Sequence, residues 1–406
     1  MEITLADDTY VVDLLVTGTQ TITLTDDGSG TDTIRVNGIY TSTVQISLAY
    51  TSEFGLPTSG SGIYYNPTGI GHSLIVNGVI ENAVGSDGQD FIQGNSIANL
   101  IYGDALASGA GLNDTLWAGS GNDTVHGGSG SDGILGDGDD DLLYGDADND
   151  TINGGGGVDT LEGGLGADVM SGGGTAGDTL SYASSASGIQ ITLEYGSATI
   201  GTGGDAAGDQ VTGFSNVAGS GQNDRIEELV KGTLAFGYND NVFSGGAGHD
   251  RLILGGGKDK GIGGAGNDTV SGELGNDVLN GGNGNDKLQG GVGKDTGIGG
   301  VGADIFLFQT AADSTAQLAG RDTIIDFSTT QHDIIDLFNI DAEAGVPGNQ
   351  AFHFITTGFT GDKGELRAKV SGSDLIVMGD INGDRTADFA ILLLNVASVT
   401  AADFNL

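Results

Sequence analysis

Single apolar residues recur every nine residues along two stretches of the chain, and glycine-rich segments separate them. The repeating unit is Gly-Gly-x-Gly-x-Asp-x-apolar-x, and its positions are numbered 1 to 9 below. In the first stretch, position 8 is occupied by Val125, Ile134, Leu143, Ile152, Leu161 and the pair Val169–Met170. In the second stretch, it is occupied by Leu252, Val270, Leu279, Leu288 and Phe306. Positions 7 to 9 therefore predict a short strand with its middle residue turned inward. Two repeats form one coil, and coils stack as parallel strands about 4.8 Å apart, so the pattern predicts an all-β fold.

Aspartate at position 6 follows the same nine-residue spacing. The first run consists of Asp114, Asp123, Asp132, Asp141, Asp150, Asp159 and Asp168. The second run consists of Asp250, Asp259, Asp268, Asp277, Asp286, Asp295 and Asp304. Carboxylate oxygens suit Ca²⁺, and glycine permits the positive φ values that a tight turn requires. The repeat is a calcium-binding nonapeptide pattern, so all these aspartates are predicted calcium ligands.

Two repeats of the second run depart from the apolar pattern. Gly261 and Gly297 occupy position 8, and Ile262 and Ile298 follow one place later. Either the strand shifts by one residue there, or the core of these coils is thin.

Composition and charge restrict the class of protein. The chain has 406 residues, 78 of them glycine, and a formal net charge of −42. Such an acidic surface argues against nucleic-acid binding. The chain has no cysteine, which excludes disulfides and zinc–thiolate sites. No apolar run reaches the roughly 18 residues of a membrane-spanning helix.

The repeats resemble those of the RTX, or hemolysin-type calcium-binding, family. The resemblance implies a right-handed parallel β-roll in which each ion bridges repeats n and n+2 along one edge. It further implies about ten or more calcium ions, and folding coupled to their binding.

The segments around the two runs resemble other parts of the same proteins. Residues 72–104 resemble the lead-in to the roll in serralysin-type metalloproteases, and Asp90 and Asn99 keep the nine-residue spacing there. Residues 178–224 resemble an insertion in which strands continue but calcium turns lapse. Asp205, Asp209 and Asp224 there either bind calcium or cap turns, and Asp224 is included among the predicted ligands. Residues 225–232 predict a short helix or an irregular excursion.

Residues 302–406 resemble the serralysin C-terminal domain, for example in RDTIIDFSTTQHDIIDL and in the ending AADFNL. The resemblance implies a β-sandwich-like cap and export by type I secretion, to the extracellular space or the cell surface. Within it, Asp380, Asn382, Asp384 and Asp388 resemble the start of an EF-hand loop. Arg385 replaces the turn glycine and Ile391 replaces the final glutamate, so a β-turn is preferred over a calcium site.

The domains expected are 1–84, a β-rich N-terminal region of unknown family; 85–178, the first roll; 179–244, an irregular insertion; 245–308, the second roll; and 309–406, the cap. Polar–apolar alternation in residues 1–71 predicts strands, either as a separate β-domain or as an irregular start of the coil. On the outer face, Trp117 and Leu135 are expected on neighbouring coils of one sheet, and His126 and Tyr144 on those of the other.

None of the five histidines is followed by Glu, so the HExxH motif of the proteases is absent. The sequence thus favours a secreted, non-catalytic structural protein that self-associates as a surface layer, filament or matrix. Two alternatives stay open. The chain could be a non-catalytic relative or accessory of a serralysin-type protease, or a polysaccharide-acting enzyme with its site in the N-terminal region.

Overall fold

The computed structural model describes residues 9–13, 21–25, 33–37, 43–49, 71–77, 82–85, 89–104, 111–174, 176–194, 199–229, 240–343 and 345–406; of the first five ranges it describes the backbone alone. The chain divides into two compact units. The first contains Met1–Tyr182 and Gly196–Phe214, and the second contains Ala183–Tyr195 and Ser215–Leu406.

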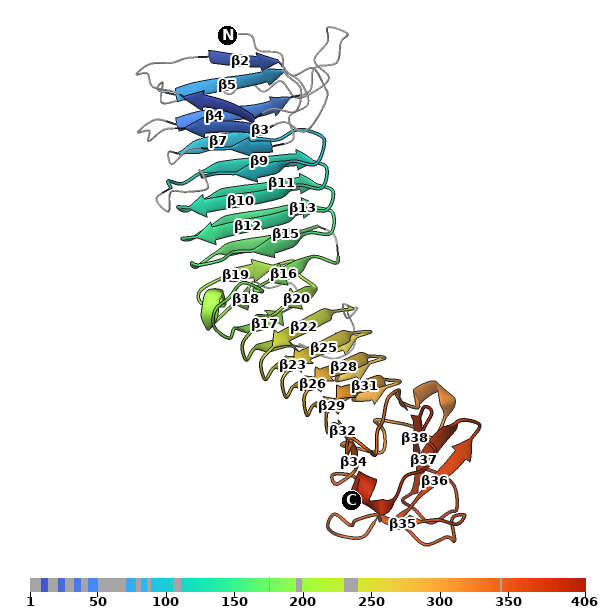
Figure 1. Ribbon diagram of the computed structural model, residues 1–406. Coiled ribbons are helices and arrows are strands. Elements are labelled where there is room, and N and C mark those ends of the chain that lie inside the picture. Colours follow the sequence, from blue (N-terminus) through green and yellow to red (C-terminus); the bar gives the residue numbers. More distant parts are fainter. Residues whose placement is uncertain are drawn as a thin grey trace. The chain divides into compact units, whose positions relative to one another are not determined.

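The first unit consists of two parallel sheets, whose strands stack in register (Figure 1). One sheet runs in the order β1 (Thr9–Asp13), β3 (Thr33–Asn37), β6 (Asn82–Val84), β8 (Leu100–Tyr102), β10 (Thr124–Ser129), β12 (Leu142–Ala147), β14 (Thr160–Glu162) and β16 (Thr179–Ser181). The other runs β2 (Thr21–Thr25), β5 (Gly71–Asn77), β4 (Thr43–Ala49), β7 (Asp90–Gln93), β9 (Thr115–Ser120), β11 (Gly133–Gly138), β13 (Thr151–Gly156), β15 (Val169–Gly173) and β19 (Gln210–Thr212). Strand β18 (Thr199–Ile200) is antiparallel to β19, and η1 (Gly204–Ala206) is a 3-10 turn.

The N-terminal strands continue this stack. β3 pairs in parallel with β6, and β4 pairs in parallel with β7. Of the two arrangements that the sequence allowed for residues 1–71, the described strands form an irregular start of the coil.

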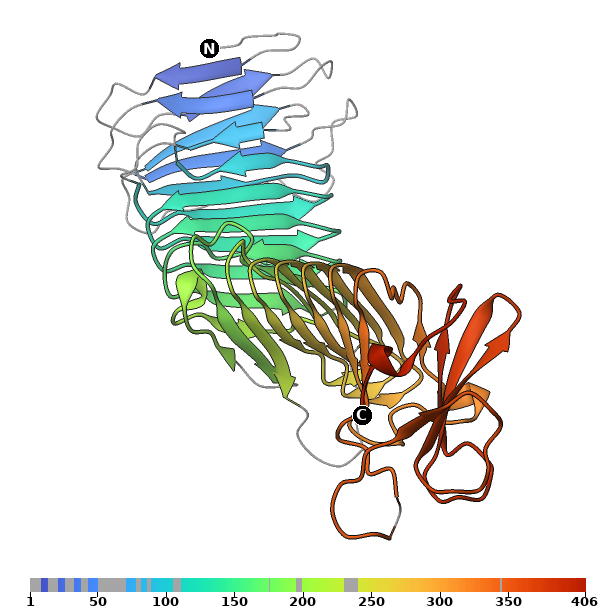
Figure 2. The same ribbon diagram turned by 60° about the horizontal axis from the view of Figure 1, so that its bottom comes forward.

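The second unit has the same two-sheet plan, and both views show its coils side by side (Figures 1 and 2). One sheet runs β20 (Asn216–Ala218), β22 (Val242–Ala247), β25 (Lys260–Ala265), β28 (Val278–Asn283), β31 (Thr296–Val301), β33 (Thr323–Ile324) and β38 (Phe389–Leu393). The other runs β17 (Gln190–Glu194), β21 (Arg225–Leu229), β23 (Arg251–Ile253), β26 (Thr269–Ser271), β29 (Lys287–Gln289), β32 (Ile305–Leu307), β34 (Ile334–Asp336) and β39 (Phe404–Asn405). A narrow third sheet contains β24 (Gly256–Gly257), β27 (Leu274–Gly275) and β30 (Val292–Gly293).

The C-terminal part adds an antiparallel sheet to this roll. β36 (Glu365–Ser371), β37 (Asp374–Asp380) and β38 are antiparallel neighbours, and β35 (His353–Ile355) is parallel to β36. η2 (Leu318–Gly320) and η3 (Ala401–Asp403) are short 3-10 turns. Because β38 and β39 pair with roll strands, the C-terminal part closes both sheets of the second unit.

The helix expected over residues 225–232 is wrong for the residues described there. Arg225–Leu229 is strand β21, paired in parallel with β17 and β23. Ile226 is buried in line with Leu252 of the next coil. Register with two neighbouring strands therefore outweighs the helix propensity of the glutamates.

The apolar slots form the core of both rolls. Val125, Ile134, Leu143, Ile152 and Leu161 are at most 3% exposed. At the ambiguous pair, Met170 takes the slot at 1% exposure, while Val169 is 45% exposed. The alternation of buried and exposed residues follows from the two-residue period of a strand.

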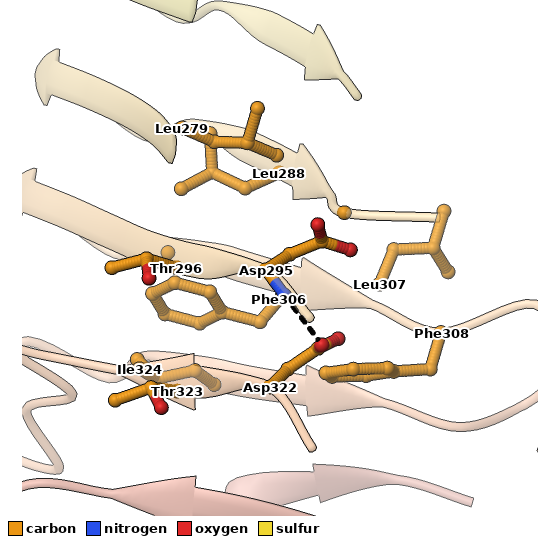
Figure 3. Close-up of a pocket in the computed structure, with 12 residues that line it drawn as sticks. Leu279, Leu288, Asp295, Thr296, Phe306, Leu307, Phe308, Asp322, Thr323 and Ile324 are labelled. Atoms are coloured by element: carbon orange, nitrogen blue, oxygen red, sulfur yellow. Dashed lines mark hydrogen bonds between the residues drawn. The ribbon is translucent and has the colours of Figure 1, made fainter. Parts of the chain in front are cut away.

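The two glycine slots are thin coils and not shifted strands. Gly261 pairs with Phe243 and Leu279 in unbroken register, and Gly297 pairs with Leu279 and Ile324. A Cβ on Gly297 would lie 3.0 Å from the Phe306 ring, so the larger neighbour uses the space that the glycine leaves. Beside it is a cavity of about 20 Å³, lined by Leu279, Leu288, Phe306, Asp322 and Ile324 among others, with room for about one water (Figure 3).

Candidate calcium ladders

Glycines in the repeat turn serve two different purposes. Positions 2 and 4 have positive φ, as at Gly155 (107°) and Gly157 (146°). Gly136, at position 1, is not in the left-handed region, but a Cβ there would collide with Oδ2 of Asp141 and with the carbonyl oxygen of Gly154. At Gly136 a carboxylate oxygen and a carbonyl oxygen therefore occupy the space that a Cβ would need, although position 1 is Ala118 in the Asp123 repeat and Leu254 in the Asp259 repeat.

The position-6 aspartates are joined by hydrogen bonds from coil to coil. In the first unit, the backbone N–H of each donates to Oδ1 of the next over 2.6–3.0 Å. The first ladder contains Asp90, Asp114, Asp132, Asp150, Asp168 and Asp209. The second ladder contains Asn99, Asp123, Asp141, Asp159 and Asp178.

The second unit repeats this arrangement over 2.7–3.1 Å. The third ladder contains Asp224, Asp250, Asp268, Asp286, Asp304 and Asp333. The fourth ladder contains Asn241, Asp259, Asp277, Asp295 and Asp322; Figure 3 shows its last hydrogen bond.

In most ladder aspartates, Oδ2 is the oxygen that lacks a partner among the described residues. In the described part of the chain, fifteen ladder aspartates have a buried Oδ2 with no hydrogen-bond partner: Asp114, Asp123, Asp132, Asp141, Asp150, Asp159, Asp168, Asp178, Asp250, Asp259, Asp268, Asp277, Asp286, Asp295 and Asp304. A buried carboxylate oxygen without a donor is costly unless a cation satisfies it.

The donor set fits calcium. Oδ2 lies beside a backbone carbonyl of the next coil, as Asp132 does beside Gly145, and Ca²⁺ accepts mixed carboxylate and carbonyl oxygens. Among the described residues, no three His, Cys, Asp or Glu side chains converge on one point. Main-chain carbonyls would therefore supply much of each coordination shell, one aspartate per turn adding charge.

Without a cation, these carboxylates hold their protons strongly. Burial, together with the neighbouring Asp132 and Asp168 carboxylates, raises the pKa of Asp150 to about 9, although the N–H of Asp132 offsets part of the rise. Burial likewise raises the pKa of Asp141 to about 8 and that of Asp295 to about 7. At neutral pH the ladders are therefore unfavourable as bare anions.

The structure places all predicted ligands in the ladders, but two differ from the rest. Asp114 heads its run in the sequence, whereas the N–H of Asp90 donates to it, so Asp114 is internal. Both oxygens of Asp224 accept hydrogen bonds from Ser220, so Asp224 differs from the fifteen aspartates whose Oδ2 has no partner in the described ranges. Asp333 at the other end of the third ladder is similar, since its Oδ2 accepts the N–H of Ser328.

Sequence reasoning missed Asp178, Asp322 and Asp333. They continue the ladders at spacings of 19, 27 and 29 residues, so they fall outside the nine-residue phase. A local signal exists, because each begins an Asp-x-apolar triplet like positions 6 to 8.

A second, outer set of bonds forms at position 5. The N–H of Asn285 donates to the side-chain oxygen of Asn267, and that of Asn267 donates to Nδ1 of His249. This outer ladder accounts for the frequent Asn-Asp pair, because the Asn side chain bonds the next coil at position 5 while the Asp side chain belongs to the inner ladder.

The structure also bears on two further predictions, the Asp380–Asp388 turn and the pairs of residues on the outer face. In the Asp380–Asp388 turn, the oxygens of Asp380 accept the N–H groups of Gly383 and Arg385, as in the preferred β-turn. The predicted outer pairs are confirmed by the register: Trp117 lies opposite Leu135, and His126 lies opposite Tyr144.

The fold and its ladders define a calcium-binding repeat protein. Residues 81–105, 108–143 and 144–176 match the RTX calcium-binding nonapeptide repeat, and residues 205–406 match the Peptidase M10 serralysin C terminal family. The chain is therefore an RTX repeat protein with a serralysin C-terminal domain, and no protease catalytic family matches it. RTX repeats are in general non-catalytic, and both families point to type I secreted proteins.

Two similar solved structures are solution structures of the AlgE6R2 and AlgE6R3 subunits of the Azotobacter vinelandii mannuronan C5-epimerase. The first is 23% identical and covers 47% of this chain and 91% of its own, with a TM-score of 0.23. The second is 25% identical and covers 45% and 78%, with the same TM-score. Scores this low give no basis for assigning an activity. No curated protein matches significantly.

No helix in the described ranges is long and apolar enough to cross a membrane.

Proposed function

We propose that this chain is an exported scaffold whose roll folds when calcium occupies the four ladders, and which then self-associates at the cell surface. The observation that carries the proposal is the set of fifteen buried Oδ2 atoms without a partner in the described ranges. A divalent cation satisfies such an oxygen and at neutral pH cancels the repulsion between coils.

The number of ions follows from the ladders. If each ion bridges two successive turns on one edge, seven uninterrupted repeats hold about five ions and the two runs about ten. Ten divalent ions would offset roughly half of the formal charge of −42. Calcium binding and folding are then one process, as in other small metal-dependent folds.

Self-association is supported by apolar side chains exposed in line on the second roll. Leu274 and Val292 lie opposite each other in the narrow third sheet, 36% and 51% exposed. Val242 and Val278 flank Lys260 on another sheet, 39% and 38% exposed. In-line apolar residues on a flat sheet provide a face that a second copy can cover.

Circular dichroism tests the folding part. In excess chelator we expect mostly coil, and millimolar calcium should restore strand cooperatively. An equally strand-rich spectrum in chelator would contradict calcium-coupled folding.

Electron micrographs with and without calcium test assembly. The expected result is an ordered layer or filament in calcium only. A monodisperse monomer in calcium that binds a serralysin-type protease would instead favour an accessory role.

A further inference from the structure

The last member of the second ladder, Asp178, breaks the regular spacing, because it follows Asp159 by 19 residues and not 18. It also lies beyond residues 144–176, the last range that matches the repeat family. The N–H of Asp159 donates to Oδ1 of Asp178 over 3.0 Å, as in every regular turn. The side chain of Asp178 is 0% exposed, and its Oδ2 has no hydrogen-bond partner in the described ranges.

The surroundings of Asp178 reproduce the regular position-1 arrangement. A Cβ on Gly172 would lie 2.7 Å from Asp178 Oδ2 and 2.8 Å from the carbonyl oxygen of Gly213. In a regular turn, a Cβ on Gly127 would lie 2.5 Å from Asp132 Oδ2 and 2.7 Å from the carbonyl oxygen of Gly145. Gly213 is far along the chain from Gly172, yet it provides the carbonyl that the next repeat would otherwise provide.

The first ladder ends differently. Asp209 accepts the N–H of Asp168 at Oδ1 over 2.8 Å, but its Oδ2 accepts the hydroxyl of Tyr182 over 3.0 Å. Tyr182 is 1% exposed, so this hydrogen bond is shielded from water. A protein donor thus holds the oxygen that is without a partner in the fifteen other carboxylates.

The structure assigns opposite roles to these two ends: Asp178 binds a calcium ion, whereas Asp209 binds none, because the Tyr182 hydroxyl takes the place of the ion. This inference rests on the proposed calcium occupancy of the ladders. The short segment Asp178–Tyr182 then has two effects. Asp178 adds one ion site to the second ladder, and Tyr182 makes Asp168 the last ion ligand of the first ladder.

The test compares Asp178→Asn and Asp209→Asn in the full chain, a matched pair in which each variant loses one carboxylate. Bound calcium per chain is measured by equilibrium dialysis and elemental analysis at saturating calcium. Asp178→Asn should lose one ion, whereas Asp209→Asn should lose none. Tyr182→Phe should lower the melting temperature without loss of an ion, while Tyr144→Phe, on the outer face, serves as the control for removing a tyrosine hydroxyl.

Asp141→Asn, an internal ladder member, separates the two levels of the argument. If it loses no ion, the proposed function fails. If it loses an ion but Asp178→Asn does not, or if Asp209→Asn loses one too, this inference is overturned while the proposed function survives. Far-ultraviolet circular dichroism in calcium shows which variants remain folded and hence comparable.

Discussion

Two segments of equal length, 114–168 in the first roll and 250–304 in the second, share one backbone plan and differ in charge. The first has thirteen acidic and no basic residues, and the second has eight acidic and five basic ones. At the two left-handed positions, the first segment has Asp137, Asp139, Asp146 and Asp148 where the second has mainly glycine. The same fold therefore tolerates a net charge of −13 or of −3.

The difference appears in the ladder carboxylates. Burial, with added repulsion from nearby aspartates, raises the pKa of Asp114 and Asp150 to about 9. In the second segment, burial raises the pKa of Asp250, Asp259 and Asp295 to about 7, the value that Asp123 and Asp132 of the first segment also reach, and that of Asp277 and Asp286 to about 6. Backbone geometry thus sets where the predicted ligands lie, and we expect the outer residues to set how strongly each roll depends on calcium.

Calcium withdrawal should separate the two rolls, and this is the largest effect expected. As free calcium is lowered, hydrogen exchange should open residues 114–168 before residues 250–304, because the first segment has more repulsion to neutralise. Trp117, the single tryptophan, lies 5.1 Å from the Phe91 ring and provides a fluorescence signal for the first roll alone. Simultaneous loss of both segments would refute the electrostatic contrast.

Acid should substitute for calcium in part. Raised folded-state pKa values mean that the calcium-free roll has its full stability below the unfolded value near 3.8 and loses it as pH rises through about 6 to 9. In chelator, strand content should therefore increase from about pH 8 to about pH 5, and more so in the first segment.

With saturating calcium the trend should be opposite, since protons displace the ions. Strand content, measured by circular dichroism as a function of pH, should therefore fall with rising pH in chelator and rise with pH in calcium, so that the two curves cross. No gain of strand in acidic chelator would show that repulsion is not what unfolds the roll.

A single turn offers a matched pair of glycines. In Gly136→Ala, the new Cβ would occupy the space between Asp141 Oδ2 and the Gly154 carbonyl, so one ion should be lost and the calcium midpoint raised several-fold. In Gly138→Ala, the nearest atom is 3.9 Å away, and the effect should stay within about 0.5 kcal/mol. Gly281→Ala makes the same change in the second roll, beside Asp286 and Gly299.

The measurement is the calcium midpoint of each variant. Equal shifts for Gly136→Ala and Gly138→Ala would mean that position 1 is glycine for a reason other than the ion.

The smallest effect concerns the extra aspartates. Asp137 has φ 74°, a strained value for a residue with a side chain. Asp137→Gly should relieve this strain and remove one repelling charge, lowering the calcium midpoint about twofold or less. Glu273→Gly, at the same turn position in the second roll (φ 71°), should change it less. A raised midpoint for Asp137→Gly would show that this aspartate helps to bind calcium.

The sequence by itself determined the features that recur in every repeat. Nine-residue spacing identified the strands, the buried slots from Val125 to Phe306 and the fourteen in-phase aspartates, because each repeat folds by local rules and stacks on a copy of itself. It also predicted the partners of Trp117 and His126, since register in such a stack is a matter of counting.

Tertiary structure decided what interrupts the repeat. The Asp168–Asp209 bond spans 41 residues, and no periodicity predicts which later aspartate fills the next place. The strand at Arg225–Leu229 and the thin coil at Gly297 likewise depend on neighbouring coils, on Ile226 in register and on Phe306 filling space. The sequence assigned one role to all the glycines of the turn, whereas the contact with the next coil shows that Gly136 also leaves room for two oxygen atoms. The local repeat determines each turn and strand. Where loops of unequal length separate the coils, however, the ladder partner is decided by whichever distant segment packs against the coil.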